Sequence, residues 1–366
     1  MKSLPDKLRK RQEQGILRSL QSFDGCIDFL SNDYLGMCRN TVLEKRISTI
    51  LDNQKLLNRN GSGGSRLLSG NLAFYEETEQ WLAHYFNAEA ALVFGNGYAA
   101  NLGLMSCLPS KADTVIYDEL IHASARDGLR LSVSKNYSFK HNDLDDLRHK
   151  LQKAEAEVYV LVESVYSMDG DFAPLAGIQA LQKEFGFTLI VDEAHAVGIF
   201  GVEAKGFGFS NEKDENLIRI VTFGKAYGVE GACVLGSAVL RNYLLNFSRP
   251  FIYSTAPSPY FFASILAAVE QVTSAGAERS ALMQTITDFT EQFESHFPCT
   301  RTPVQVFIPG NLERLKQLTL LAKEQNLALK PVYAPTVPEG QERLRIVLHS
   351  YNTKAEIDQL KRILTV

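Results

Sequence analysis

A lysine and an aspartate each follow a short apolar segment, where a side chain would stand at the end of a strand. Asp192 comes directly after Thr188–Val191, and Lys225 comes shortly after Ile218–Thr222. A lysine amine is protonated and inert at neutral pH unless a dry pocket or a cationic neighbour lowers its pKa. A neutral lysine suits Schiff-base chemistry, and an aspartate beside a protonated pyridine nitrogen keeps that ring electron-accepting. The pair therefore favours a pyridoxal phosphate site. Taken alone, Asp192 could instead be a helix cap or part of a structural ion pair, and Lys225 could be a solvated turn residue.

Two histidines extend this set. His195 lies three residues after Asp192, and His122 follows another apolar run, Thr114–Tyr117. Each has a structural alternative, as a core histidine or as the first residue of a helix. A third apolar run ends in a polar cluster, namely Glu163, Ser164 and Ser167. The other histidines show no ligand spacing, so we expect no metal site.

A glycine-containing turn offers a candidate phosphate site. The segment LVFGNGYAAN passes from an apolar stretch into a helical pattern, with Gly95 and Gly97 at the turn. Backbone N–H groups at the start of a helix bind phosphate well. The same letters match G-x-G-x-x-A, and Asp118 lies at a distance suited to a ribose-binding acid, so a nicotinamide-dependent dehydrogenase is an alternative from another enzyme class. We rank the dehydrogenase lower because it gives Asp192, His195 and Lys225 no role.

Apolar runs alternate with helical periodicity through the middle of the chain. The predicted strands are Ala90–Phe94, Thr114–Tyr117, Glu157–Glu163, Thr188–Val191 and Ile218–Thr222. The predicted helices are Leu72–Phe86, Asp143–Lys153 and Leu175–Phe185. The alternation indicates an α/β fold with a largely parallel sheet, and Val234–Leu240 is expected as a further strand at an antiparallel edge. Ligands bind outside the carboxyl ends of such strands, which is where the reactive residues fall.

The pattern changes after Pro250. Long helices are expected at Tyr260–Ser274 and Arg279–His296, followed by strand, helix, strand, strand and helix. We therefore predict an N-terminal segment (1–45), a large α/β domain (46–250) and a small α+β domain (251–366). Within the first segment, Leu4–Leu20 is expected to form an amphipathic helix.

Length and composition limit the class of protein. The chain has 366 residues, which suits two domains. Thirty-eight Lys plus Arg against 42 Asp plus Glu give a net charge of −4, which argues against nucleic acid or a membrane surface as the main partner. Five cysteines without a close pair indicate a reducing compartment, and no signal peptide or membrane-spanning run is expected. We predict a soluble cytoplasmic protein.

Nine segments in order resemble motifs of the α-oxoamine synthases, pyridoxal phosphate enzymes of the aspartate aminotransferase fold (fold type I). They are FLSNDYLGM (29–37), GSGGSRLLSG (61–70), GNGYAAN (95–101), ESVYSMDGD (163–171), VDEAHAVGIFG (191–201), TFGKAYGVEGA (222–232), FIYSTA (251–256), PTVPEG (335–340) and RLRIVL (343–348). The resemblance covers nearly the whole chain. It implies a large domain with a mostly parallel sheet and a smaller α+β C-terminal domain.

The resemblance also implies how the cofactor, pyridoxal 5'-phosphate, is held. Lys225 would form the Schiff base and later act as the general base, while Asp192 would pair with the pyridine nitrogen. His195 would bond the phenolic oxygen of the ring, and His122 would stack on its face and help to orient the substrate. Further cofactor contacts would come from Gly97, Tyr98, Ser167 and Thr222, and from Ser254 and Thr255, which would reach the neighbour's phosphate in a homodimer with shared active sites.

Substrate contacts are implied in the same way. Arg345 resembles the arginine that clamps the amino acid carboxylate, a task that suits a planar guanidinium. Asn32 would face the substrate, and Arg18 and Thr336 match positions that contact the acyl substrate. Tyr333 stands where some relatives carry an arginine, which bears on recognition of the acyl chain.

FIYSTA and TFGKAYG are most similar to the branch of the family that makes an oxononanoate. That similarity implies condensation of L-alanine with pimeloyl-CoA or pimeloyl-carrier protein, giving 8-amino-7-oxononanoate, CO2 and a free thiol in biotin biosynthesis. Glycine C-acetyltransferase, 5-aminolevulinate synthase and serine palmitoyltransferase are the alternatives within the family. A catalytically silent binding protein of the same fold is a further alternative.

Overall fold

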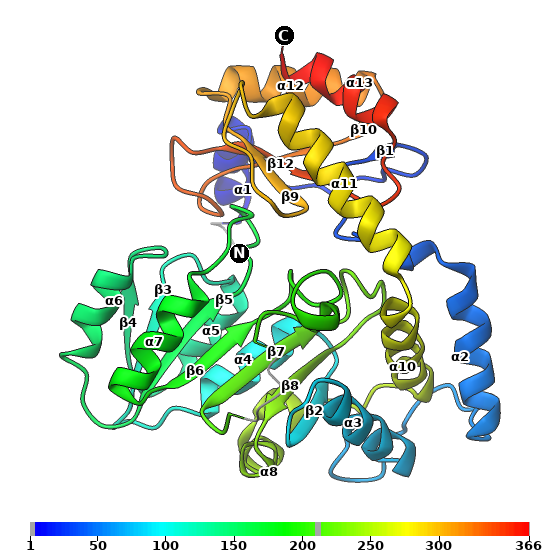
Figure 1. Ribbon diagram of the computed structural model, residues 1–366, viewed down its shortest axis with the longest axis vertical. Coiled ribbons are helices and arrows are strands. Elements are labelled where there is room, and N and C mark those ends of the chain that lie inside the picture. Colours follow the sequence, from blue (N-terminus) through cyan, green and yellow to red (C-terminus); the bar gives the residue numbers. More distant parts are fainter. Residues whose placement is uncertain (1–3, 209–213, 366) are drawn as a thin grey trace. The chain divides into compact units, whose positions relative to one another are not determined.

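The computed structural model describes residues 4–208 and 214–365, which divide into two compact units (Figure 1). The large unit comprises Asn32–Gln284 and His349–Tyr351, and the small unit comprises the described parts of Met1–Ser31, Thr285–Leu348 and Asn352–Val366. The domain borders predicted after residues 45 and 250 stay a prediction. Within the described ranges, no helix is both long and apolar enough to cross a bilayer.

A seven-stranded sheet forms the centre of the large unit, in the order β2-β8-β7-β6-β5-β3-β4 (Figure 1). The strands are β2 (Ala90–Phe94), β3 (Thr114–Asp118), β4 (Lys135–Phe139), β5 (Val158–Glu163), β6 (Thr188–Asp192), β7 (Leu217–Thr222) and β8 (Ala232–Gly236). β8 is antiparallel to both of its neighbours, β2 and β7, and all the other neighbouring strands are parallel to each other. The expected α/β class and mostly parallel sheet are confirmed.

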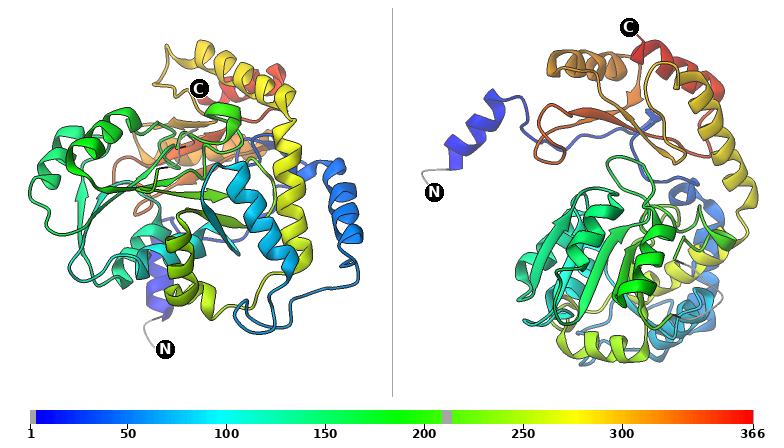
Figure 2. Two further views of the ribbon diagram at one scale, coloured as in Figure 1. Left: turned by 60° about the horizontal axis from the view of Figure 1, so that its bottom comes forward. Right: turned by 60° about the vertical axis from the view of Figure 1, so that its left-hand side comes forward.

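Both faces of this sheet are covered by helices, as the views in Figure 2 also show. Because side chains alternate along a strand, Leu161 packs on one face while Val160 and Val162 pack on the other. The first face holds α4 (Gly97–Cys107), α5 (Ala123–Leu131) and α8 (Ala238–Phe247), and the second holds α6 (Leu144–Leu151) and α7 (Leu175–Phe185). A sheet buried on both sides explains the nearly continuous apolar runs of its strands.

The sheet differs from the prediction at two strands, although β8 is antiparallel as expected. The segment expected as an edge strand at Val234–Leu240 contains the end of β8, which lies between β2 and β7, and the start of α8. The strand stops there because the Ser237 hydroxyl accepts a hydrogen bond from the Leu240 amide at 3.1 Å and caps the helix. The edges of the sheet are β2 and β4, and β4 was missed because its sequence, KNYSF, is largely polar and mostly exposed.

Further helices complete the large unit. They are α2 (Thr41–Asn53), α3 (Ala73–Tyr85), α9 (Arg249–Ile252), α10 (Pro259–Thr273) and the first part of α11 (Gly276–Phe293). The apolar helix α10 is largely buried, and Ser258 caps it by accepting from the Phe261 amide. The predicted helices at 72–86 and 260–274 are therefore present within a residue or two of their expected ends.

The small unit is an α+β structure. Its three-stranded antiparallel sheet has the order β11 (Lys330–Val332), β12 (Arg343–Val347), β9 (Val304–Phe307), and β1 (Ile27–Asp28) pairs in parallel with β10 (Leu327–Ala328). Its helices include α12 (Leu312–Glu324) and α13 (Lys354–Leu364), the latter started by a capping box of Thr353 and Glu356. The expected order of strand, helix, strand, strand and helix is present except that three strands, β10, β11 and β12, lie between the two helices.

The N-terminal helix is shorter than predicted. The sequence pattern suggested Leu4–Leu20, but α1 covers only Leu4–Glu13. Gly15 follows it with φ at +69°, a left-handed conformation that ends a helix and that glycine adopts easily.

Candidate active site

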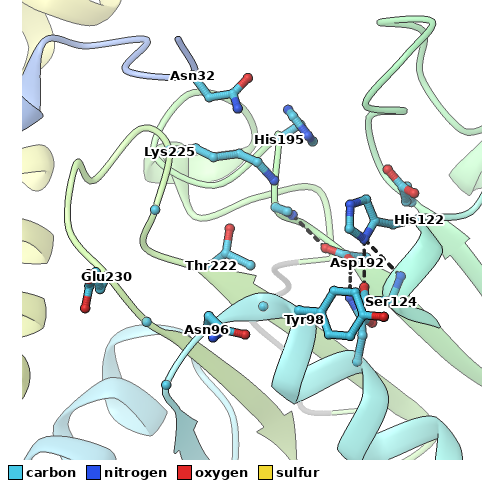
Figure 3. A pocket seen from close by; sticks show the side chains of 17 residues that line it. Asn32, Asn96, Tyr98, His122, Ser124, Asp192, His195, Thr222, Lys225 and Glu230 are labelled. Carbon is cyan, nitrogen blue, oxygen red and sulfur yellow. Dashed lines mark hydrogen bonds between the residues drawn. The ribbon is translucent and has the colours of Figure 1, made fainter. Parts of the chain in front are cut away.

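A cavity of about 450 Å³ lies at the carboxyl ends of β5, β6 and β7 in the large unit (Figure 3). Eight of the predicted site residues line it: Asn32, Gly97, Tyr98, His122, Asp192, His195, Thr222 and Lys225. These residues come from the ends of four different strands or the segments just after them, and from the segment before α2. The parallel sheet brings them together because the ends of its strands meet at one edge.

Asp192, the last residue of β6, is held by two hydrogen bonds. The Asn101 side-chain amide on α4 donates to Oδ2 at 2.8 Å, and the Ala194 backbone amide donates to Oδ1 at 3.0 Å. The side chain is buried, with 6% exposed. Two donors and burial fix the carboxylate so that it can face a cationic ring nitrogen. Sequence reasoning missed Asn101, although it is the last residue of the GNGYAAN motif.

His195 lies in the turn after β6, where it meets a buried tyrosine. Its Nδ1 is 2.5 Å from the Tyr34 hydroxyl, and Tyr34 is fully buried. This contact fixes the orientation of the imidazole ring in the cavity. Tyr34 belongs to the FLSNDYLGM motif but had no assigned role, since nothing in the sequence places residue 34 beside residue 195.

His122 is the residue before α5 and caps that helix. Its Nδ1 accepts from the Ser124 backbone amide at 3.2 Å and lies 2.7 Å from the Ser124 hydroxyl. Desolvation lowers the pKa of His122; Asp192 opposes the shift and Lys225 adds to it. The imidazole is therefore neutral at neutral pH, which suits stacking against a flat ring.

The start of α4 and the end of β7 form a candidate phosphate site. A Cβ at Gly97 would come within 2.7 Å of the Thr222 methyl group, so a larger residue would close the approach. Asn96 caps α4 by accepting from the Ala99 amide at 2.8 Å, and the free amides of the first turn can bind an anion. The buried Thr222 hydroxyl has no hydrogen-bond partner among the described residues, as expected for a group that awaits a ligand.

Lys225 extends from the turn after β7 into the same space as His195 and Asp192 (Figure 3). Its turn closes with a 2.9 Å hydrogen bond from the Gly228 amide to the Lys225 carbonyl. Gly228 has φ at +68°, and a Cβ there would lie 2.4 Å from the Cys38 nitrogen, so only glycine fits. Close packing of this turn fixes the root of the lysine while its amine stays in the cavity.

Three predicted cofactor residues do not line the cavity. Ser167 is buried behind it, and its backbone amide donates to Glu163 at 3.3 Å. Ser254 and Thr255 are exposed, and Thr255 pairs with Ser65 in an isolated bridge beside the loop of GSGGSRLLSG. Their exposure is compatible with the expected role toward a neighbouring subunit, which stays a prediction.

The other predicted substrate residues belong to the small unit. The Arg18 guanidinium donates to the Thr336 hydroxyl at 3.3 Å, and both line a second cavity of about 370 Å³ together with Arg11, Lys330 and Tyr333. Arg345 is buried on β12. The two predicted acyl contacts, Arg18 and Thr336, therefore lie together. Three cationic side chains, including Arg18, surround the same cavity.

The structure does not support the dehydrogenase alternative, in which Asp118 would bind a ribose. Asp118 is fully buried at the end of β3, and it accepts hydrogen bonds from the backbone amides of Leu120 and Asn142. It also lies 3.0 Å from Nδ1 of His141. These bonds occupy its oxygens, and Asp118 is not among the residues that line the cavity.

Comparison with known proteins decides the family. The model of the aminotransferase class I and II family matches residues 24–364. The chain belongs to this family. It is similar to the 8-amino-7-oxononanoate synthase of Emericella nidulans (38% identical, over 98% of this chain and 93% of that one) and to that of Chromobacterium violaceum (35%, over 97% and 94%).

Solved structures of the same fold cover nearly the whole chain. The 8-amino-7-oxononanoate synthase of Francisella tularensis has a TM-score of 0.78 at 28% identity and covers 93% of this chain and 97% of its own. A serine palmitoyltransferase of Sphingomonas wittichii has a TM-score of 0.88 at 25% identity and covers 99% and 96%. The predicted resemblance to the α-oxoamine synthases and the fold type I architecture are confirmed.

Proposed function

We propose that this protein is a pyridoxal phosphate-dependent acyltransferase of the 8-amino-7-oxononanoate synthase type, which condenses L-alanine with a pimeloyl thioester in biotin biosynthesis. One observation carries the proposal: Lys225 and Asp192 meet in a cavity that also has a helix start open to phosphate. The full-length similarity to several 8-amino-7-oxononanoate synthases supports the same reaction.

The residues of the cavity fit the cofactor. The first turn of α4 with Gly97, Tyr98 and the unpartnered Thr222 hydroxyl would hold the phosphate. Asp192 would face the ring nitrogen, and His122 would lie against the ring. Bound there, pyridoxal phosphate supplies an aldehyde that condenses with amines and a ring that accepts electrons from the α-carbon of the amino acid.

The remaining chemistry falls to side chains of this chain. The Lys225 amine removes the α-proton of the bound amino acid and later returns a proton to that carbon. Asp192 holds the proton on the ring nitrogen, and the Asn101 amide keeps the carboxylate in place. Arg345 binds the carboxylate of the amino acid, and Asn32 faces the substrate. Holding the substrate by its carboxylate fixes which bond is broken, an effect of orientation.

The acyl donor and the assembly are part of the proposal. Arg18 and Thr336 would contact the acyl thioester, supported by the shared cavity that they line. The exposed Ser254 and Thr255 would reach the phosphate of a second subunit, which makes the enzyme a homodimer with shared sites. The five cysteines are unpaired, which supports a cytoplasmic location.

An assay matrix tests the reaction. Alanine, glycine and serine are each combined with pimeloyl, acetyl, succinyl and palmitoyl thioesters, and release of thiol and CO2 is measured. We expect alanine with a pimeloyl donor to react fastest. The structural likeness to serine palmitoyltransferases gives the sharpest competing outcome, serine with a palmitoyl donor, and that result would move the protein to another branch of the family.

The cofactor is tested separately by reduction. Borohydride added to the yellow holoenzyme should fix pyridoxal phosphate to Lys225, which peptide mass spectrometry locates. A colourless protein that binds a nicotinamide cofactor would contradict the proposal.

A further inference from the structure

Glu163 is a buried acid in the cavity that the chemistry above does not use. It is the last residue of β5, and in the sheet register it lies directly opposite Asp192 on β6. It lines the cavity, yet only 3% of it is exposed. Two carboxyl groups therefore stand side by side at the point where two central strands end.

The two carboxyl groups differ in their hydrogen bonds. Both oxygens of Asp192 accept from amide donors, at 2.8 and 3.0 Å. Glu163 accepts the Ser167 backbone amide on Oε2 at 3.3 Å, whereas its buried Oε1 has no partner among the residues that the structure describes. A buried anion with one bare oxygen is costly, while a protonated acid carries no charge to solvate. The bonding pattern thus suits a charged Asp192 and a neutral Glu163.

The charges around Glu163 favour the same assignment. Burial and the neighbouring Asp192 raise the pKa of Glu163 to about 8, although Lys225 and the backbone amides of His122 and Ser167 act in the opposite direction. Tyr166, the other titratable group that interacts with it, carries no charge at neutral pH because burial raises its pKa further above the ordinary value. Two carboxyl groups in one buried site do not both carry a charge readily, because like charges repel each other there.

We propose that Glu163 is protonated in the working enzyme, so that Asp192 is the single carboxylate beside the cofactor ring and Glu163 is a neutral group in the wall of the cavity. Glu163 is then a positioning residue. It accepts the backbone amide of Ser167 and so holds the turn after β5. The protonation of Glu163 can be tested without the cofactor, whereas its role beside the cofactor rests on the proposed function.

Stability against pH measures the proton directly. A group whose folded pKa lies above its unfolded value of 4.5 takes up a proton on folding, so its contribution to stability falls as pH rises from about 4.5 to about 8. In urea unfolding of the full-length protein without cofactor, the unfolding constant of wild type relative to Glu163→Gln should rise about tenfold per pH unit in that window. Glu157→Gln, in the exposed position just before the same strand, should leave the slope unchanged.

A second measurement does not depend on how well the variant folds. Infrared spectra of wild type between pH 6 and pH 10 should show the band of a buried protonated carboxyl group that disappears as pH rises through the alkaline range. A flat unfolding ratio together with no such band would overturn the proposal, because both results require an ionised Glu163.

Function gives the matched comparison. Glu163→Gln keeps a neutral group of the same shape, so it should retain pyridoxal phosphate and stay within about tenfold of wild-type turnover. Asp192→Asn makes the same chemical change in the residue opposite Glu163, and it should lose both pyridoxal phosphate and turnover. Equal losses in the two variants would mean that the charge on Glu163 is needed and would overturn the proposal. A protein that binds no pyridoxal phosphate at all would refute the proposed function, while the two proton measurements would still decide the state of Glu163.

Discussion

The cavity of the large unit and the predicted substrate contacts of the small unit hold their side chains in different ways. Asp192 and His195 are buried, with 6% and 5% exposed, and each has a hydrogen-bonded partner on another segment. Arg18 and Thr336 are exposed and share one 3.3 Å hydrogen bond. A cofactor that every catalytic cycle reuses needs fixed groups, whereas an acyl chain can be bound by groups that adapt.

We therefore expect substitutions in the cavity of the large unit to alter the chemistry, and substitutions around the second cavity of the small unit to alter substrate specificity. Groups in the large unit are fixed by strand register, so a substitution there removes a function outright. Most of the described groups of the small unit around the second cavity stand on loops and a short strand, and only Arg11 and Thr319 among them stand on helices. Three substitutions, taken in order of expected effect, test this comparison.

Lys225→Ala should give the largest effect. Removing the amine removes the general base and the attachment point of the cofactor, so turnover should fall by at least about 10²–10⁴-fold. The fold should persist, since the residue stands in a turn at the cavity and is not part of the buried core. Thiol release and the thermal unfolding midpoint are measured together, with Lys111→Ala on the exposed surface as the control. Substantial activity in Lys225→Ala would contradict the central role of this lysine.

His141→Gln tests the support behind the cavity. His141 bridges Asp118 at 3.0 Å and Asp171 at 2.8 Å, which links the turn before His122 to the segment that follows Ser167. Loss of these charge-assisted bonds should lower the free energy of unfolding by about 1–3 kcal/mol at pH 7. The exposed His149→Gln is the matched control and should change little.

The pH dependence of this effect follows from the protonation of His141. Burial acts to lower its pKa, but the hydrogen bonds and charges of Asp118 and Asp171 raise it from 6.5 to about 10. A raised folded pKa contributes stability that is complete below the unfolded value and is lost as pH rises through the folded one. The difference between wild type and His141→Gln should therefore be full near pH 6 and shrink toward pH 10. A difference that grows with pH would show that the histidine is neutral in the folded protein.

Arg18→Ala should give the smallest effect. The guanidinium makes one hydrogen bond to Thr336 and lines the second cavity, so its loss should raise the KM for the acyl thioester by about two- to tenfold. Cofactor absorbance and the KM for alanine should stay unchanged. Arg9→Ala, on the exposed helix α1, provides the control. A loss of cofactor in Arg18→Ala would contradict the division between the two sets of residues.

Much of the fold was predictable because local sequence sets it. β2, β3, β6 and β7 were expected within a residue or two, since a strand buried on both faces is an apolar run that ends where polar residues begin. The polar edge strand β4 and the position of β8 were not predictable in this way. Hydrogen bonds to one neighbour define an edge strand, and nothing in its own residues records which strand that neighbour is.

The site divides along the same line. Lys225, Asp192, His195 and His122 could be proposed from their positions after strands and from the family motifs, and the structure gathers them around one cavity. The residues that hydrogen-bond to them could not be proposed from the sequence. Asn101 supports Asp192 from 91 positions earlier, and Tyr34 meets His195 across 161 positions. Such distant pairs leave no local pattern.

The sequence by itself determined the positions of the apolar strands and of most helices, the reactive residues and the family, because each of these depends on neighbouring residues or on short motifs. The tertiary structure alone decided that Glu163 and Asp192 stand side by side, that Asp192 has both of its oxygens bonded, and that Glu163 has one oxygen bare. The physical reason is that the charge of a carboxyl group depends on what surrounds it in space, and burial and long-range contacts arise only when the chain has folded.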